Sequence, residues 1–291
     1  MATKIEWTNE TWNVVTGCSK ISPGCAHCYA DRMSKRLAGR CRYPAAPHNF
    51  DVTLHPDRLE EPLRWKKPRR VFVVSMGDLF HDDVPDEFID RVFTVMGRKC
   101  PNHTFQVLTK RPERMLEWHK RYCDAMMRGE NSPYPNVWLG VTAENQEQAD
   151  KRIPVLLQTP AAVRFVSVEP MLGPVDLSEW LGITHDEYYG KWTVDERGCI
   201  SGKWWPDWVI CGGETGPGAR PMHPDWARSL RDQCQAAGVA YFFKQWGEYK
   251  PGFNSYTTPD GITMYKVGKK DAGRLLDGRE WNEYPEVGDG D

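Results

Sequence analysis

The feature of this chain that most limits its fold is a regular alternation of short apolar runs with helix-like stretches. Runs rich in β-branched and aromatic residues occupy positions 12–15, 71–75, 104–108, 137–141, 163–168, 208–211 and 240–243, and residues 51–54 form a further short run. Helical patterns lie between them at 29–37, 85–97, 112–127, 146–157 and 224–237. Strands that alternate with helices are typical of a parallel sheet. We therefore predict an α/β protein with a parallel (β/α) barrel, partial or distorted relative to a TIM barrel.

The length and the breaks in the repeat predict how the chain is divided. Its 291 residues are many for one ordinary domain, but α/β barrels reach this size as one unit. We expect residues 1–250 to form the barrel. Residues 178–207 are rich in Trp, Tyr, Gly and charge, which predicts an insertion or hairpin over the barrel mouth. Residues 251–291 are expected to form a C-terminal extension with a disordered end.

Composition predicts a cytoplasmic protein with reduced thiols. The chain opens with the polar and charged residues MATKIEWTNE, and no apolar run approaches the roughly 20 residues of a membrane helix. We therefore expect no signal peptide and no membrane partner. The 9 cysteines are odd in number and irregularly spaced, unlike the disulfide framework of a small secreted protein.

Positive charge is concentrated in the first half of the chain. Residues 1–130 contain 22 Lys or Arg against 17 Asp or Glu, and residues 131–291 contain 16 against 23. Lys66, Lys67, Arg69 and Arg70 form the tightest basic cluster, beside Trp65. Such a cluster can bind a phosphate backbone, and a solvated loop before a buried strand is the alternative. DNA, RNA or a nucleotide is therefore a candidate partner.

Three cysteines stand close together after the first predicted strand. Cys18, Cys25 and Cys28 form a C-x6-C-x2-C run that leads into a predicted helix. Thiolates grouped in this way indicate a metal or iron–sulfur site. A closed structural site uses four protein ligands, whereas three leave one coordination position for a substrate or cofactor. We predict that these three cysteines are metal ligands.

Ionisable side chains follow almost every predicted strand. In a βα barrel the carboxyl ends of the strands lie on one face, where active sites are built. The residues at these ends include Asp78, Lys110, Glu144, Glu169, Glu214 and Lys244. A helix cap or a salt bridge is the alternative for any one of them. Their recurrence favours a shared polar cavity.

A three-cysteine loop after the first strand of a βα barrel resembles the radical S-adenosylmethionine superfamily. The resemblance implies that Cys18, Cys25 and Cys28 hold a 4Fe-4S cluster whose fourth iron binds the amino and carboxyl groups of S-adenosylmethionine. It implies reductive cleavage of the sulfonium to a 5′-deoxyadenosyl radical, which abstracts hydrogen from a substrate. An electron donor such as flavodoxin or ferredoxin is then a required partner.

The same resemblance assigns cofactor-binding residues near the cysteines. The first gap holds six residues, where the superfamily usually has three. Met76-Gly77-Asp78 stands where a Gly-Gly-Glu segment usually follows the second strand, so Gly77 and Asp78 take its place, with Asp78 on the cofactor's amino group. His27 occupies the usual aromatic position before the last cysteine, and Tyr29 follows that cysteine.

Later strand ends supply further candidates for the cofactor site. We expect Glu144 or Glu169 near the ribose and Lys110 or Lys244 near a carboxylate or phosphate. Glu214, which ends a Gly-Gly-Glu segment after a late strand, is another candidate. These roles are hypotheses from position in the chain.

The sequence is also similar to a three-cysteine family of phages and prophages that is related to radical enzymes. The similarity covers about residues 5–250. It rests on IEWT at 5–8, TWN at 11–13, GC at 17–18, CYA at 28–30, DLFH at 78–81, LTKRP at 108–112, GVT at 140–142, VEPM at 168–171, GGE at 212–214 and FKQWG at 243–247. This family implies no substrate. With the basic cluster, we predict modification or repair of a nucleobase or nucleotide.

The principal alternative is a zinc-binding, nucleic-acid-binding protein without radical chemistry. Adding Cys41 gives C-x6-C-x2-C-x12-C, and His27, His48 or His81 can also complete a tetrahedral site. The isolated cysteines are expected to be ordinary buried residues; they are Cys100, Cys123, Cys199, Cys211 and Cys234.

Overall fold

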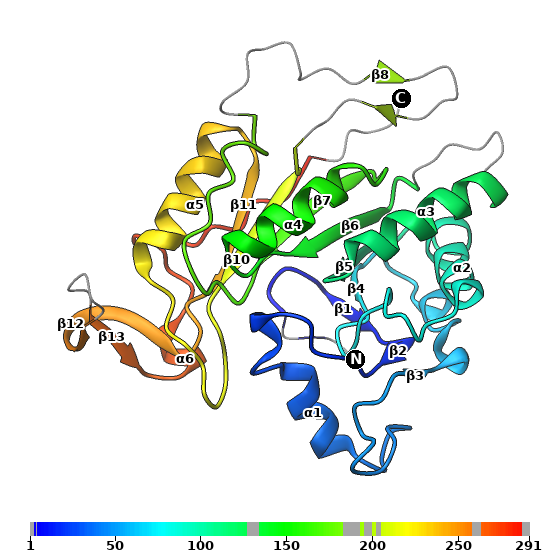
Figure 1. Ribbon diagram of the computed structural model, residues 1–291, viewed down its shortest axis with the longest axis horizontal. Coiled ribbons are helices and arrows are strands. Elements are labelled where there is room, and N and C mark those ends of the chain that lie inside the picture. The colour runs from blue at the N-terminus through cyan, green and yellow to red at the C-terminus, as the bar shows by residue number, and fades with distance from the viewer. Residues whose placement is uncertain are drawn as a thin grey trace.

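Seven parallel strands form one curled sheet in the computed structural model of this chain (Figure 1). The structure describes residues 3, 5–126, 134–182, 193–194, 200–201, 205–257 and 263–286. The strand order is β1 (Glu10–Trp12), β4 (Arg70–Val73), β5 (Thr104–Thr109), β6 (Val137–Thr142), β7 (Val163–Val168), β10 (Trp208–Gly212) and β11 (Ala240–Gln245). The sheet is a half-barrel with β1 and β11 at its edges. The predicted α/β fold with a partial parallel barrel is confirmed.

Helices follow the strands as the repeat predicts. They are α1 (Tyr29–Leu37), α2 (Asp86–Thr94), α3 (Pro112–Met126), α4 (Gln146–Leu157), α5 (Pro224–Ala236) and the short α6 (Lys269–Ala272). A π-helical turn over Val95–Lys99 extends α2. Local signals place the helix starts: the Asn145 side chain accepts a hydrogen bond from the Gln148 N–H, and α5 opens on Pro224.

The predicted strand at 12–15 is wrong in its extent. The main-sheet strand β1 ends at Trp12, and the next residues form β2 (Val15–Thr16), which pairs antiparallel with β3 (Thr53–Leu54) outside the main sheet. The reason is Asn13, whose side-chain oxygen accepts hydrogen bonds from the Ser75 hydroxyl and the Met76 N–H. These contacts turn the chain away from β4.

The two faces of the sheet carry different side chains. The face toward α2–α5 is apolar and belongs to the main core, with Val107, Leu139 and Val166 as examples. The opposite, inner face carries a second cluster near the amino ends of the strands, which we call the aromatic plug: Trp7, Trp138, Phe165, Trp208 and Phe242. The Trp208 ring lies 5.9 Å from that of Trp138, 5.8 Å from Phe165 and 6.0 Å from Phe242.

Strand periodicity turns several polar residues to the same inner face. Side chains at i, i+2 and i+4 of a strand share one side of a sheet. Counting from the plug, Thr142 is four residues after Trp138, Glu169 is four after Phe165, and Lys244 is two after Phe242. The inner face is therefore aromatic at the amino ends of these strands and polar at their carboxyl ends.

The segments outside the repeat have structure of their own. Within 178–207 the structure describes a turn and an antiparallel pair, β8 (Thr193–Val194) and β9 (Ile200–Ser201). In Figure 1 this pair lies far from α1. Residues 183–192, 195–199 and 202–204 lie outside the described residues.

The C-terminal segment packs against the half-barrel. It contains a hairpin of β12 (Tyr249–Thr257) and β13 (Thr263–Lys266). Leu276 and Trp281 belong to the main core, and the Phe243 N–H donates to the Trp281 carbonyl. The predicted disordered end, residues 287–291, lies outside the described residues. Among the helices that the structure describes, none is long and apolar enough to span a membrane.

Candidate metal and cofactor site

The segment 17–28, which we call the cysteine loop, lies at the carboxyl ends of the strands. Its start is pinned by hydrogen bonds from the Gly17 N–H to the Met76 carbonyl and from the Cys18 N–H to the Phe50 carbonyl. Gly17 has a φ of +87°, and a Cβ there would lie 2.2 Å from the Asp51 carbonyl oxygen. A side chain is therefore excluded where the loop leaves the sheet.

All three cysteines of the loop line one cavity of about 190 Å³. They are free thiols of intermediate exposure, and none forms a disulfide. The cavity is also lined by residues from the strand ends and from α1, including Gly77, Asp78, Thr109, Lys110, Thr142 and Tyr29. The structure thus brings together three cysteines and four other residues that the sequence predicts for this site: Tyr29, Gly77, Asp78 and Lys110.

The donor set of this cavity fits a group that takes three thiolates. Its one lining carboxylate, Asp78, accepts four protein hydrogen bonds: from the Phe80 N–H, the Thr109 hydroxyl, the Lys110 N–H and the Arg111 guanidinium. Four donors fill the capacity of a carboxylate. The lining residues therefore offer three sulfurs and no uncommitted fourth ligand of the Cys, His, Asp or Glu type.

Within the described residues, no group of three or more His, Cys, Asp or Glu side chains converges on one metal ion. A tetrahedral zinc ion draws its ligands onto one centre, whereas each cysteine of a four-iron cluster binds a different iron. Three cysteines that line one cavity suit the second arrangement.

The residues of the zinc alternative do not gather around this cavity. Cys41 is exposed and is not among its lining residues. His48 pairs with Asp51, with 2.8 Å between Nδ1 and the carboxylate, and His81 bonds the Ser19 hydroxyl at 2.8 Å. His27 pairs with Glu214 instead.

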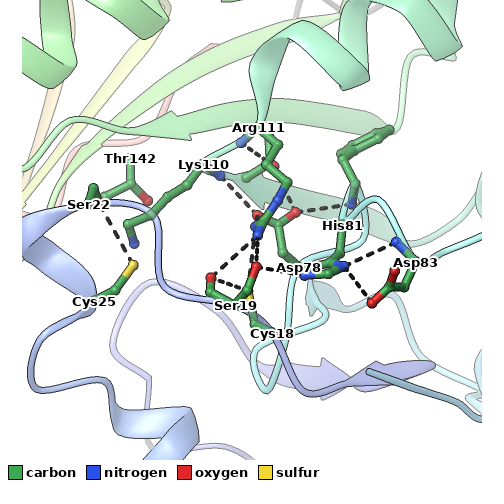
Figure 2. A network of polar contacts seen from close by, with 12 residues as sticks. Cys18, Ser19, Ser22, Cys25, Asp78, His81, Asp83, Lys110, Arg111 and Thr142 are labelled. Carbon is green, nitrogen blue, oxygen red and sulfur yellow. Dashed lines mark hydrogen bonds and ion pairs between the residues drawn. The ribbon is translucent and has the colours of Figure 1, made fainter. Parts of the chain in front are cut away.

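Cys18 is bound to a buried arginine (Figure 2). Arg111 Nη1 donates to Cys18 Sγ at 3.4 Å and to Asp78 Oδ2 at 3.2 Å, while Nη2 donates to Ser19 Oγ at 2.7 Å. Burial and then the charge of Asp78 raise the pKa of Cys18, and Arg111 opposes them in part. The thiol of the metal-free protein is therefore protonated at neutral pH.

Cys25 has a different electrostatic environment. Burial alone would raise its pKa, but the charge of Lys110 and hydrogen bonds at Ile21 and Ser22 outweigh burial, and the net pKa lies below the ordinary value. Among the described residues, none gives the Lys110 ammonium a hydrogen bond or an ion pair. This cation is available for an anionic ligand, or for the thiolate of Cys25.

Glu144 fastens the cysteine loop to the end of β6. It is fully buried, and its carboxylate accepts hydrogen bonds from the Gly24 N–H at 3.0 Å and from Arg152 at 2.8 Å. Burial would raise its pKa, but hydrogen bonding by Ser22 and the charges of Arg152 and Lys110 lower it overall. A Cβ on Gly24 would lie 2.9 Å from Glu144 Oε1, so a side chain here would require the carboxylate to shift.

Glu214 fastens the same loop from the end of β10. Its carboxylate accepts hydrogen bonds from His27 at 3.1 Å and from Arg220 at 2.6 and 2.8 Å. Arg220 also donates to the Pro23 carbonyl. Burial would raise the pKa of Glu214, but the hydrogen bonds from Arg220 and His27 lower it overall. Both glutamates are therefore ionised and support the loop at neutral pH.

A second cavity of about 200 Å³ adjoins the first. The two share Cys28, Tyr29 and Lys110, and the second is also lined by His27, Glu169 and Glu214, among others. Glu169 forms an ion pair with Lys244, whose Nζ lies 2.8 and 3.1 Å from the two carboxylate oxygens. The predicted strand-end residues therefore lie together at the carboxyl ends of the strands. The roles predicted for them in cofactor binding remain proposals.

Sequence reasoning predicted no supporting role for the residues that hold this site in place. Arg111, Arg152, Arg220, Ser19 and His81 make its supporting contacts. Each arginine is paired with a carboxylate, but Arg152 lies 8 residues after Glu144, and Arg111 lies 33 residues after Asp78. The pairing partners are therefore visible only in the folded structure.

The basic cluster at 66–70 lies at the other end of the sheet. Arg70 opens β4, so the cluster precedes the amino end of a strand whose carboxyl end faces the cysteines. Arg69 is paired with Glu10 at 2.6 Å, and the Arg70 guanidinium lies 3.9 Å from the centroid of the Tyr284 ring. Lys66 and Lys67 are exposed. This position favours the solvated loop over a substrate contact at the cysteine cavity.

Comparison with known proteins gives a family but no activity. The geometry defines an α/β half-barrel with a three-cysteine cavity at the carboxyl ends of its strands. A family model described as "Protein of unknown function (DUF5131)" matches residues 2–285, and the chain belongs to that family. The curated proteins contain no match.

A solved structure of a spore photoproduct lyase mutant is similar in part. Its TM-score is 0.41 at 9% identity, and the alignment covers 90% of this chain and 69% of the lyase chain. A likeness this distant carries no argument about the chemistry of the present protein.

Proposed function

We propose that this protein is a radical S-adenosylmethionine enzyme that holds a 4Fe-4S cluster through Cys18, Cys25 and Cys28. The observation that carries the proposal is the single cavity lined by three free cysteines and by no uncommitted fourth ligand. When bound, the cluster and S-adenosylmethionine together supply a 5′-deoxyadenosyl radical by reductive cleavage of the sulfonium. The open coordination position is what a three-thiolate set provides for such a cofactor.

The residues of the second cavity are suited to bind the polar groups of the cofactor. Lys110 offers a cation without a protein partner among the described residues, which suits a carboxylate. Glu169 and Lys244 offer opposite charges side by side, which suits an ammonium or ribose hydroxyls. The ring of Tyr29 is exposed between the two cavities and offers an aromatic face. We therefore place the cofactor between the cysteines and the Glu169–Lys244 pair.

Asp78, Glu144 and Glu214 have a supporting role in this proposal. Each carboxylate is buried and already accepts several protein hydrogen bonds. A contact from Asp78 to the cofactor's ammonium, as the superfamily resemblance implies, requires one of four existing donors to leave. Through their present contacts, these residues hold the cysteine loop against the strand ends and keep Lys110 and Arg111 in position.

For the substrate we propose a nucleobase or nucleotide, with a flavodoxin or ferredoxin as electron donor. This step rests on the aromatic and cationic groups at the cavities, Tyr29 and Lys110. If the substrate is DNA or RNA, its retention should fall steeply as salt is added, because displaced counterions drive such binding. Retention that salt does not change would contradict a nucleic-acid substrate.

The proposal is tested by product formation. Protein purified and reconstituted without oxygen is reduced with dithionite in the presence of S-adenosylmethionine, and 5′-deoxyadenosine is measured by chromatography. We expect the product from the wild type and from Cys41→Ala, and none from Cys28→Ala. Iron-loaded protein that forms no 5′-deoxyadenosine would contradict the radical function.

A further inference from the structure

One of the three cysteines is tied to a fixed positive charge. Arg111 is 8% exposed, and its guanidinium donates to the Cys18 sulfur at 3.4 Å. Cys25 has a neutral partner, the Ser22 hydroxyl at 3.7 Å. Within the described residues, no side-chain hydrogen bond reaches the sulfur of Cys28. The three proposed ligands are therefore unequal, and Cys18 alone has a charged donor.

Arg111 is held in place from several sides (Figure 2). Its backbone N–H donates to the Thr109 hydroxyl, and that hydroxyl donates to Asp78 Oδ1 at 2.7 Å. Its side chain is paired with Asp78 Oδ2 and also donates to the Ser19 carbonyl. A guanidinium with these contacts has no second position available without breaking buried hydrogen bonds. The cation therefore stays beside Cys18.

His81 completes the support on the other side. The Asp83 N–H donates to His81 Nδ1 at 3.1 Å, so the neutral ring carries its proton on Nε2 and donates it to Ser19 Oγ at 2.8 Å. Burial and the nearby charge of Arg111 lower the pKa of His81, which keeps the ring neutral. Ser19 thus accepts from both His81 and Arg111 and fixes the start of the cysteine loop.

We propose that Arg111, oriented by Asp78, raises the reduction potential of the centre that the three cysteines hold. The inference rests on the proposed function. One-electron reduction adds one negative charge to the centre, with the electron coming from a low-potential one-electron donor of the flavodoxin or ferredoxin class. A fixed cation on a ligand sulfur stabilises that added charge, as hydrogen bonds to cluster sulfurs do. Asp78 limits the effect because its own charge lies close to the same sulfur.

Two single substitutions with opposite signs test this inference. In Arg111→Gln the cation is lost, and the midpoint potential should shift to a more negative value. In Asp78→Asn the opposing anion is lost, and the potential should shift to a more positive value. Arg114→Gln is the matched control, because Arg114 lies in the first turn of α3, directly after Arg111, and is paired with Asp86 away from the cysteines.

The potential is measured by redox titration with dithionite and mediators, followed by electron paramagnetic resonance, without S-adenosylmethionine. Iron and sulfide content shows that each variant is loaded. A loaded Arg111→Gln protein with an unchanged or higher potential would overturn the inference and leave the proposed function standing. If Arg111→Gln does not fold, Arg111→Met takes its place, and an unchanged or higher potential in the loaded Arg111→Met protein would overturn the inference. Wild-type protein without iron would instead overturn the proposed function, and the inference with it.

Discussion

The amino and carboxyl ends of the inner sheet face have opposite character although the same strands build both. At the amino ends the aromatic plug packs ring against ring, and Gly140 leaves the room that Phe165 needs, since a Cβ there would lie 2.6 Å from the Phe165 ring. At the carboxyl ends Thr142 and Glu169 line the two cavities, and Lys244 is paired with Glu169. Under the proposed function, the packed and the chemical ends of these strands are separate, as they are in βα barrels.

The largest effect should come from the carboxyl end, at the cysteines. Replacing Cys18, Cys25 or Cys28 by alanine removes one of three ligands, so nearly all of the bound iron should be lost. Cys41→Ala is the matched control and should keep its iron, because Cys41 lies outside the cavity. Iron content and absorbance near roughly 400 nm measure the outcome. Equal iron loss in Cys41→Ala would mean four protein ligands.

The largest effect on folding should come from the amino end. Trp208 is fully buried and contacts four other rings of the plug region, so Trp208→Ala should lower the free energy of unfolding by about 3–5 kcal/mol. Urea denaturation of the metal-free protein measures it. Folded Trp208→Ala protein should still bind iron. The control is Trp226→Ala, at a half-buried tryptophan of α5. This substitution should lower the free energy of unfolding by less than Trp208→Ala does.

Replacing Glu144 should have an intermediate effect, both on the free energy of unfolding and on the rate at which the cluster is released. In Glu144→Gln the buried Arg152 loses its charged partner, which should cost about 1–3 kcal/mol of unfolding free energy. Because the Gly24 N–H also loses a charged acceptor, the cysteine loop should loosen and the cluster should be released faster. Glu147→Gln, at an exposed ion pair on α4, is the control. Cluster release at the wild-type rate would show that Glu144 does not hold the loop.

The two glutamates that fasten the loop should also make the stability of the protein depend on pH. The pKa values of Glu144 and Glu214 are lowered by folding, so their contribution is complete above the ordinary value of about 4.5 and is lost as the pH falls through the folded pKa values. The melting temperature of the metal-free protein should therefore decline below about pH 4.5. The decline should be shallower in Glu214→Gln. An identical acid slope in the variant would count against this contribution.

The smallest effect should come from the basic cluster at the amino end. Lys66 and Lys67 are exposed, so replacing both by alanine should change the unfolding free energy by less than about 0.5 kcal/mol and leave iron content unchanged. Iron analysis and urea denaturation measure both quantities. A marked loss of iron in this double variant would show that the two ends of the sheet are coupled.

The sequence predicts the fold well because hydrophobic period and chain order are local properties. Helix bounds at 29–37 and 146–157 agree with α1 and α4. The split of the 12–15 strand was not predicted, because it depends on Asn13 contacting residues about 60 positions away. Likewise, the Gly and Asp content of the tail gives no sign that Trp281 enters the main core.

The same limit applies to the site. The grouping of Cys18, Cys25 and Cys28 is visible in the sequence because the ligands are close along the chain. The rule that strand ends meet on one face placed Asp78, Glu144 and Glu214 near the loop, but it does not say what they bind. Only the folded structure shows that Glu144 binds the Gly24 N–H and that Glu214 binds His27. Each of these contacts joins segments that are far apart in the sequence.

The most direct test of the account is the metal and sulfide content of wild-type protein purified without oxygen. We predict about four irons and four sulfides per chain after reconstitution, with a broad absorption that gives a brown solution. A colourless protein with about one zinc per chain, held with the help of Cys41, would contradict it.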